Sequence, residues 1–144
     1  MSKYVFFDID GTLWDDKMIV PESTKVALKK LQENGHKAFI CTGRARGNVN
    51  DPQFDEIGFD GFIAACGNHV EMDGKILYER NMSYEDVKDV YEVSHKYHLP
   101  IIYEGLKYQW MDRNGFEGDA YIHIAIAMIY KHLIPFTLGR FDHR

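Results

Sequence analysis

A short apolar run that ends on two carboxylates is the feature that most constrains the fold of this chain. Residues 4–7 (YVFF) are aromatic or β-branched, and Asp8 and Asp10 follow directly. A continuous apolar run of this length is typical of a strand buried on both faces, as in a parallel sheet. Side chains at i and i+2 leave a strand on the same side, so we expect both carboxylates to face one site.

Further apolar runs extend this strand into an α/β fold. Residues 37–41 and 61–66 predict a second and a third buried strand, with a polar, helical stretch between them. A period of 3.6 residues predicts an amphipathic helix before the second strand, carried by Thr24, Ala27, Leu28 and Leu31. Alternating strands and helices predict a Rossmann-like parallel sheet with right-handed crossovers.

A hairpin and then a change in composition follow the third strand. Asp73 and Gly74 lie between two short extended runs, which indicates a type I′ turn. A helix is predicted to begin after residue 81, and an antiparallel strand pair is predicted over residues 101–103 and 108–111. We therefore predict two domains, residues 1–81 and residues 82–144.

Composition argues against nucleic-acid and membrane partners. Seventeen Lys and Arg residues stand against 22 Asp and Glu residues, which gives a formal net charge of -5. The longest apolar tract, residues 120–138, is interrupted by charged residues and proline and does not resemble a membrane span. We expect no signal peptide and a cytoplasmic protein, with Cys41 and Cys66 as reduced, buried core residues.

The paired carboxylates suggest phosphate chemistry assisted by a cation. Asp8 and Asp10 repel each other, and a phosphate adds further negative charge, so Mg²⁺ held by both is the expected cofactor. One carboxylate can act as nucleophile and the other as general acid and base. The alternative is a solvated acidic turn or a calcium-type loop, but Leu13 and Trp14 follow where an EF-hand would continue with oxygen ligands.

Residues 8–13 (DIDGTL), placed directly after an apolar strand, resemble the first motif of the haloacid dehalogenase superfamily. The resemblance implies that Asp8 becomes phosphorylated and that Asp10 manages the protons of the leaving group and of water. Gly11 and Thr12 of this motif are candidate substrate-binding residues.

Thr42, Gly43 and Arg44 follow the second strand and resemble the family's second motif. The resemblance implies that the Thr42 hydroxyl binds the transferring phosphoryl oxygen, with Gly43 and Arg44 as further substrate-binding candidates. Taken alone, Thr42-Gly43 fits a strand-to-helix turn with a capping hydroxyl as well.

The hairpin after the third strand, followed by a helix and further strands, is similar to the Cof-type sugar-phosphate phosphatases of subfamily IIB. The resemblance covers about residues 3–112 and implies an incomplete haloacid dehalogenase core with a partial α/β cap. Gly67-Asn68 reverses the Asn-Gly order that is usual in this subgroup.

The family completes its site with a Lys and a later Gly-Asp-x-x-x-Asp segment, and we expect this chain to stop before both. Gly118-Asp119 lacks a preceding apolar strand and a following acid, whereas Lys107 and Lys131 fit solvated surface positions. Residues 121–128 fit a strand or a helix equally well.

An incomplete sheet would leave the first strand partly unpaired, and this invites pairing with another chain. We therefore expect a homo-oligomer formed by strand exchange, unless the residues after Asp112 cover the edge within one chain.

Two functions stay open. The first is a Mg²⁺-dependent phosphohydrolase that acts on small phosphorylated metabolites, such as sugar phosphates, through an aspartyl phosphate on Asp8. The second is an inactive remnant that binds phosphate or assembles with a protein partner. A phosphoacceptor receiver domain is disfavoured, because its acidic pair would precede the phosphorylated Asp, whereas Asp15-Asp16 follows the motif.

Overall fold

The computed structural model describes residues 1–112 and 133–136, and the chain divides into two compact units, Met1–Arg80 and Asn81–Arg144. The first unit contains, in chain order, β1 (Tyr4–Phe7), α1 (Glu22–Glu33), β2 (Lys37–Cys41), the 3-10 turn η1 (Arg46–Asn48), α2 (Pro52–Ile57), β3 (Gly61–Ala64), the 3-10 turn η2 (Ala65–Gly67), β4 (His69–Met72) and β5 (Lys75–Glu79). The described part of the second unit contains α3 (Tyr84–Lys96), β6 (Ile102–Glu104), β7 (Gln109–Asp112) and β8 (Leu133–Phe136).

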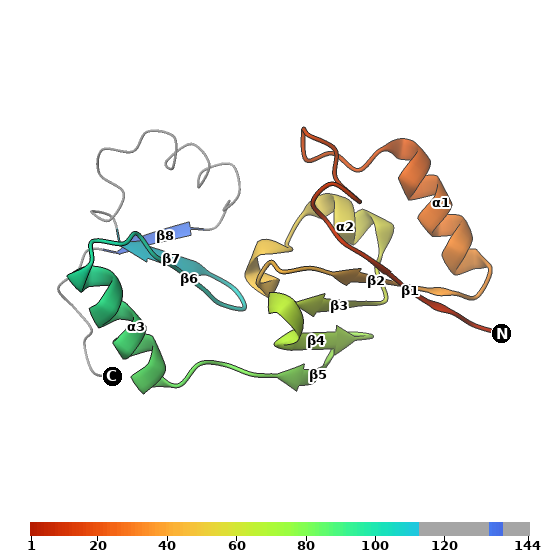
Figure 1. Cartoon of the computed structure of the whole chain (residues 1–144). Coiled ribbons are helices and arrows are strands. Elements are labelled where there is room, and N and C mark those ends of the chain that lie inside the picture. The colour runs from red at the N-terminus through yellow and green to blue at the C-terminus, as the bar shows by residue number, and fades with distance from the viewer. Residues whose placement is uncertain (113–132, 137–144) are drawn as a thin grey trace. The chain divides into compact units, whose positions relative to one another are not determined.

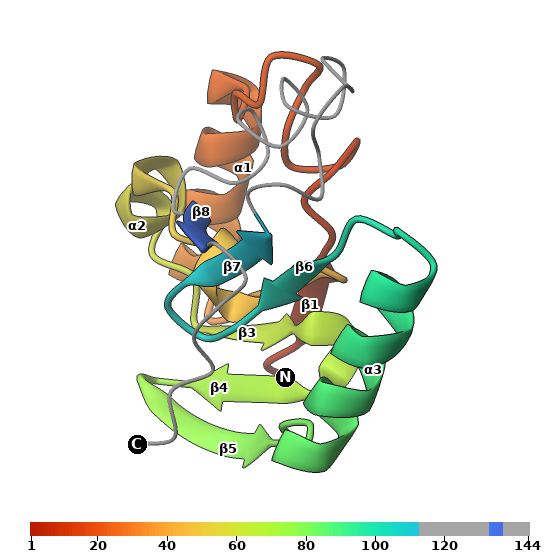
Figure 2. The same ribbon diagram turned by 90° about the vertical axis from the view of Figure 1, so that its left-hand side faces the viewer.

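The first unit is built on a five-stranded sheet with the order β1-β2-β3-β4-β5 (Figure 1). Strands β1, β2 and β3 are parallel, and Phe7 lies beside Ile40, which in turn lies beside Phe62. Strands β4 and β5 continue the sheet in antiparallel pairs, with β5 at its outer edge (Figure 2). The predicted α/β fold with a Rossmann-like parallel portion is therefore confirmed.

The β4–β5 hairpin turns at Asp73 and Gly74, as predicted. Both residues have positive φ values, 49° and 74°, which a type I′ turn requires at its two central positions. The hairpin adds two antiparallel strands directly after the parallel portion of the sheet.

The hydrophobic core of the first unit lies between the sheet and the two helices α1 and α2, which lie beside each other in both views (Figures 1 and 2). Ala38 and Ile40 alternate along β2 and therefore project to the helix-covered face. They pack in one cluster with Leu28 of α1 and Phe54 of α2. The same cluster takes in Ile9, Leu13, Trp14, Val20 and Val49 from the loops.

Strand β1 differs from the expected strand buried on both faces. Tyr4 and Phe6 are 55% and 52% exposed, and both contact the ring of Phe39 on the face away from α1 and α2. The reason is that β1 pairs only with β2 among the described residues, so it forms the other edge of the sheet.

The prediction that Cys41 and Cys66 are buried is wrong, because both are exposed. Cys41 ends β2 and alternates in direction with the buried Ile40 and Thr42. Cys66 lies in η2, where the chain has already left β3 and adopts a positive φ of 53°. Both cysteines are free thiols.

In the second unit, the predicted antiparallel pair is confirmed as β6 and β7, and β8 pairs with β7 in parallel. Helix α3 begins at a capping box in which Ser83 and Asp86 exchange hydrogen bonds. Gly118-Asp119, Lys131 and residues 121–128 lie outside the described residues. Over the part of the chain that is described, every helix is too short or too polar to cross a membrane.

Asp60, directly before β3, links the amino ends of β2 and β3. Its carboxylate accepts hydrogen bonds from the backbone N–H of Ala38, at 2.9 Å, and from the ammonium group of Lys37, at 2.8 Å. The side chain is only 20% exposed, so water replaces these partners poorly.

We predict that Asp60→Ala lowers the free energy of unfolding by about 1–3 kcal/mol, because it leaves the Ala38 N–H without its acceptor. Asp60→Asn keeps an acceptor oxygen and should cost less. Urea denaturation of the three proteins measures the difference. Equal stability of Asp60→Ala and the native protein would contradict the assigned role.

Candidate active site

The two candidate carboxylates lie in the loop that follows β1. Ile9, between them, is fully buried, so Asp8 and Asp10 are left exposed on either side of it. The carbonyl oxygen of Ile9 accepts hydrogen bonds from the backbone N–H groups of Leu13 and Trp14, at 3.0 and 2.9 Å. These bonds curl the chain back after Asp10 and bury Leu13 and Trp14 in the core.

Gly11 and Thr12 complete this turn. Gly11 has a φ of 73°, a conformation that favours glycine, and Thr12 is exposed. The turn therefore keeps the polar residues 10–12 on the surface while its flanking residues anchor it in the core.

The Thr42 loop meets the same edge of the sheet. Because β1 and β2 are parallel neighbours, Asp8 and Thr42 both follow the carboxyl ends of adjacent strands. Thr42 is 6% exposed, and its hydroxyl oxygen accepts a hydrogen bond from the backbone N–H of Arg44, at 3.2 Å. This bond closes a local turn and is not the helix cap considered above, because the 3-10 turn that follows has Ala45 at its N-cap with no side-chain cap. The hydroxyl proton still leaves one donor for a bound oxygen.

An ion pair joins the two loops directly. The guanidinium of Arg44 donates from Nε to Oδ2 of Asp10, at 2.8 Å, and from Nη2 to Oδ1, at 2.6 Å. This is a bidentate fork, the strongest geometry that an Arg–carboxylate pair adopts. The hydrogen bonds from Arg44 hold the pKa of Asp10 below its usual value, against a weaker opposing effect of partial burial.

Arg44 itself rests on an aromatic ring. Its guanidinium carbon lies over the indole of Trp14, 5.1 Å from the ring centroid, and Trp14 is stacked on Phe54 at 5.2 Å. Only 15% of the Arg44 side chain is exposed. The contact makes Trp14 part of the site, although the sequence offered no signal for it beyond its place shortly after the acidic motif.

The donors present are compatible with Mg²⁺. Asp8 makes no side-chain hydrogen bond or ion pair with the described residues, whereas both oxygens of Asp10 are engaged by Arg44. Among the described residues no three His, Cys, Asp or Glu side chains are grouped closely enough to hold a metal. Mg²⁺ nevertheless binds through only one or two carboxylates, because it keeps several waters, so Asp8 alone offers the type of ligand it prefers.

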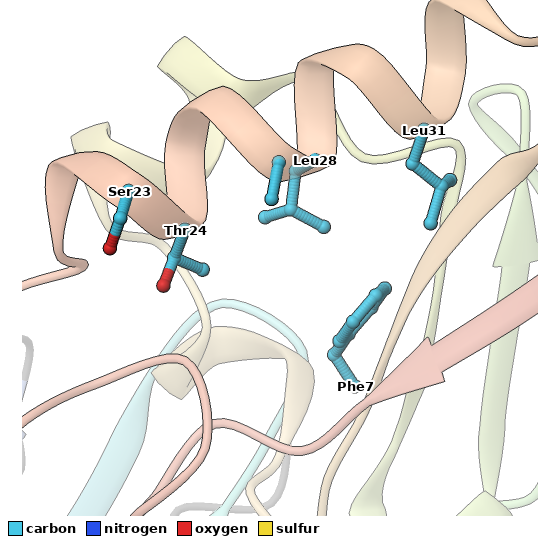
Figure 3. A pocket seen from close by; sticks show the side chains of 6 residues that line it. Phe7, Ser23, Thr24, Leu28 and Leu31 are labelled. Atoms are coloured by element: carbon cyan, nitrogen blue, oxygen red, sulfur yellow. The ribbon is translucent and has the colours of Figure 1, made fainter.

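A pocket of about 290 Å³ lies apart from these residues, between β1 and α1 (Figure 3). Phe7 projects from β1 toward Leu28 and Leu31 of the helix, and Ser23, Thr24 and Ala27 complete the lining. The lining includes none of the candidate catalytic residues, so this apolar hollow belongs to the edge of the sheet rather than to the acidic site.

The fold and the acidic loop thus define an α/β protein with paired carboxylates at the carboxyl end of a parallel strand. The family model for haloacid dehalogenase-like hydrolases matches residues 5–132. The chain belongs to this family.

Known proteins support the assignment. The "Putative phosphatase YkrA" of Bacillus subtilis is 31% identical over 102 residues, which cover 71% of this chain and 39% of that protein. A hypothetical protein of Geobacillus kaustophilus has a solved structure that matches with a TM-score of 0.77 and 31% identity, over 95% of this chain and 52% of that one. The subclass IIB sugar phosphatase BT4131 has the same fold, with a TM-score of 0.74 and 23% identity, over 95% of this chain and 53% of that one.

The predicted resemblance to the family is therefore confirmed, and a subclass IIB sugar phosphatase is among the solved structures that share the fold. The chain spans about two fifths of the curated relative and about half of the solved structures.

We predict that Arg44→Met destabilises the protein in a pH-dependent manner. The folded-state pKa of Asp10 is lowered, so its pairing with Arg44 stabilises the fold fully above the unfolded-state pKa of about 3.9. The contribution is lost as the pH falls through the lowered pKa. Because Asp10 is half exposed, the difference at neutral pH should stay below about 1 kcal/mol.

Urea denaturation of both proteins at several pH values between about 7 and 3 measures this difference. A difference that shrinks on acidification supports the ion pair. A constant difference would instead mean that Arg44 stabilises the fold only through its contact with Trp14.

Proposed function

We propose that this chain carries the nucleophile half of a Mg²⁺-dependent phosphohydrolase, with Asp8 as the nucleophile, and that its substrates are small phosphorylated metabolites such as sugar phosphates. The observation that supports this most strongly is the pair of loops at one sheet edge, with an unengaged Asp8 carboxylate beside an Asp10 carboxylate held by Arg44. The similarity to a subclass IIB sugar phosphatase supports the substrate class. On this proposal, residues 1–81 form the catalytic core and residues 82–144 part of a cap.

The proposed reaction runs in two steps. A carboxylate oxygen of Asp8 attacks phosphorus, the bond to the leaving oxygen breaks, and Asp10 donates a proton to that oxygen as the alcohol departs. Asp10 then takes a proton from the water that attacks the aspartyl phosphate, which releases inorganic phosphate and restores Asp8. Mg²⁺, when bound, lowers the repulsion between the anionic groups.

The remaining candidates fit supporting roles in this scheme. The Thr42 hydroxyl has a proton to donate to a phosphoryl oxygen. The Thr12 N–H already donates to the Ile9 carbonyl at 3.3 Å, so this exposed turn can offer the Thr12 hydroxyl and the Gly11 N–H, and the Thr42 loop the Gly43 N–H. Arg44 favours the ionised form of Asp10, and this suits the second step, in which Asp10 acts as a base. In the first step Asp10 acts as an acid, so the bidentate hydrogen bonds from Arg44 must loosen there.

We predict Mg²⁺-dependent hydrolysis of p-nitrophenyl phosphate by the 144-residue chain. Asp8→Asn should reduce turnover to the uncatalysed background, and Asp10→Asn should reduce it by about 10²–10⁴-fold. Asp16→Asn, which changes an exposed acid of the same loop, is the matched control and should keep full activity.

A folded protein without turnover that still binds inorganic phosphate would support the alternative, an inactive family member with a binding role. Calorimetry with phosphate in the presence of Mg²⁺ distinguishes the two. Absence of both turnover and phosphate binding would contradict both functions.

We also propose that β1 is covered by a second copy of this chain. The edge of β1 opposite β2 is unpaired among the described residues, Tyr4 and Phe6 are half exposed, and Phe7 opens into the apolar pocket against α1. An unpaired strand edge flanked by apolar side chains is a template for pairing with another strand.

We keep the expected cytoplasmic location as a proposal, because two cysteines are too few for a disulfide framework.

We predict that light scattering coupled to size exclusion gives an oligomeric mass for the native chain and a monomeric mass for Phe6→Lys, because the lysine places a charge on the pairing surface. Tyr78→Lys is the matched control, since Tyr78 is a half-exposed aromatic residue on the opposite edge strand, β5. A native chain that is monomeric at every concentration would contradict the proposal.

A further inference from the structure

Trp14 is connected to Asp10 by two separate routes. The first route runs through side chains: the guanidinium of Arg44 lies over the indole ring, and Arg44 donates to both carboxylate oxygens of Asp10. Through the backbone, Trp14 and Asp10 form an isolated parallel bridge, and the Trp14 N–H donates to Ile9, the residue before Asp10. A displacement of the ring would therefore disturb both the backbone and the side chain of Asp10.

The ring itself is held by the core. Trp14 is 7% exposed and stacks on Phe54, which is 1% exposed and belongs to α2. Phe54 in turn packs edge-on against Phe59. The orientation of the indole is thus set by residues of the hydrophobic core rather than by the surface loop.

An Arg–carboxylate pair at a surface normally contributes little, because two long side chains lose freedom when they adopt one geometry. Stacking on a fixed ring removes much of that freedom from the guanidinium beforehand, and the weakly hydrated guanidinium suits such a contact. Arg44 shows both features, since it lies over the indole and is only 15% exposed.

We infer that Trp14 is a positioning residue for the proposed acid–base carboxylate: its buried ring holds Arg44 in the fork that fixes the orientation of Asp10. The catalytic consequence of this inference rests on the proposed function. The contact between the side chains of Trp14, Arg44 and Asp10 is independent of that function and can be measured without turnover.

Arg46, two residues further along the chain, provides an internal control. Its Nε donates to Oε1 of Glu71 at 2.8 Å, and its guanidinium lies over the ring of Phe62 at 4.1 Å. Arg46 therefore has the same two kinds of contact as Arg44, but with partners other than Trp14 and Asp10.

Solvent exchange of the arginine Nε–H protons, followed by ¹H–¹⁵N NMR of the 144-residue chain, tests the inference. The native protein should show slow exchange at both Arg44 and Arg46. Trp14→Met should accelerate exchange at Arg44 by about tenfold, as expected when a partly desolvated cation–π contact is lost, and should leave Arg46 unchanged. Trp14→Phe should restore most of the protection, because the indole N–H makes no hydrogen bond within the described residues.

Unchanged exchange at Arg44 in folded Trp14→Met would overturn the inference. If Trp14→Met does not fold, the contact is tested from its other side with Arg44→Met, in a Trp110→Phe background that leaves Trp14 as the single tryptophan. Acrylamide should then quench Trp14 fluorescence more strongly than in the same background with Arg46→Met. Equal quenching would also overturn the inference.

The two proposals fail in different ways. In an active protein, Trp14→Met should lower kcat for p-nitrophenyl phosphate while KM stays within about twofold, because Asp10 acts in the chemical steps rather than in binding. A native chain without turnover would contradict the proposed function, but the exchange rates at Arg44 would still decide the positioning role.

Discussion

Parallel pairing of β1 with β2 is the interaction on which the candidate site depends. The register that places Phe7 beside Ile40 brings Asp8 and Thr42 to the same edge of the sheet, although 34 residues separate them in the chain. Burial of Ile9 then fixes which way the following residues point, and it leaves the two acids on the surface. A shift of one residue in this register would turn the alternating side chains to the wrong faces and separate the two loops.

The charges of the site are arranged around Arg44. Two carboxylates near one another are unfavourable, and the fork of Arg44 neutralises one of them while Asp8 stays free of partners among the described residues. The two carboxylates therefore have different surroundings, although both are Asp side chains. This difference lets one act as a potential nucleophile and the other as a potential proton carrier. The stack of Arg44, Trp14 and Phe54 links this electrostatic arrangement to the hydrophobic core.

The unpaired edge of β1 is the second main feature of the fold. A strand composed of Tyr4, Val5, Phe6 and Phe7 suits the middle of a sheet, yet it is paired on one side only within the described residues. The apolar pocket against α1 and the half-exposed aromatic rings lie along the same strand. An unpaired strand edge beside exposed apolar side chains is the kind of surface that can pair with another strand.

The sequence alone determined the elements and the family, because both depend on local patterns. Apolar runs located β1, β2 and β3, Asp73-Gly74 located the hairpin, and the spacing of Asp8 and Asp10 indicated the chemistry. Burial was predicted less well: the sequence indicated a partly unpaired first strand, but it could not show that Tyr4 and Phe6 are half exposed or that Cys41 and Cys66 lie on the surface. Exposure depends on neighbours distant in the chain.

Only the tertiary structure decided that Arg44 donates to both carboxylate oxygens of Asp10, 34 residues away in the chain, and that the Trp14 ring lies beneath the Arg44 guanidinium. Neither contact has a periodic signature, because each forms where two loops meet and is set by the register of the strands that carry them.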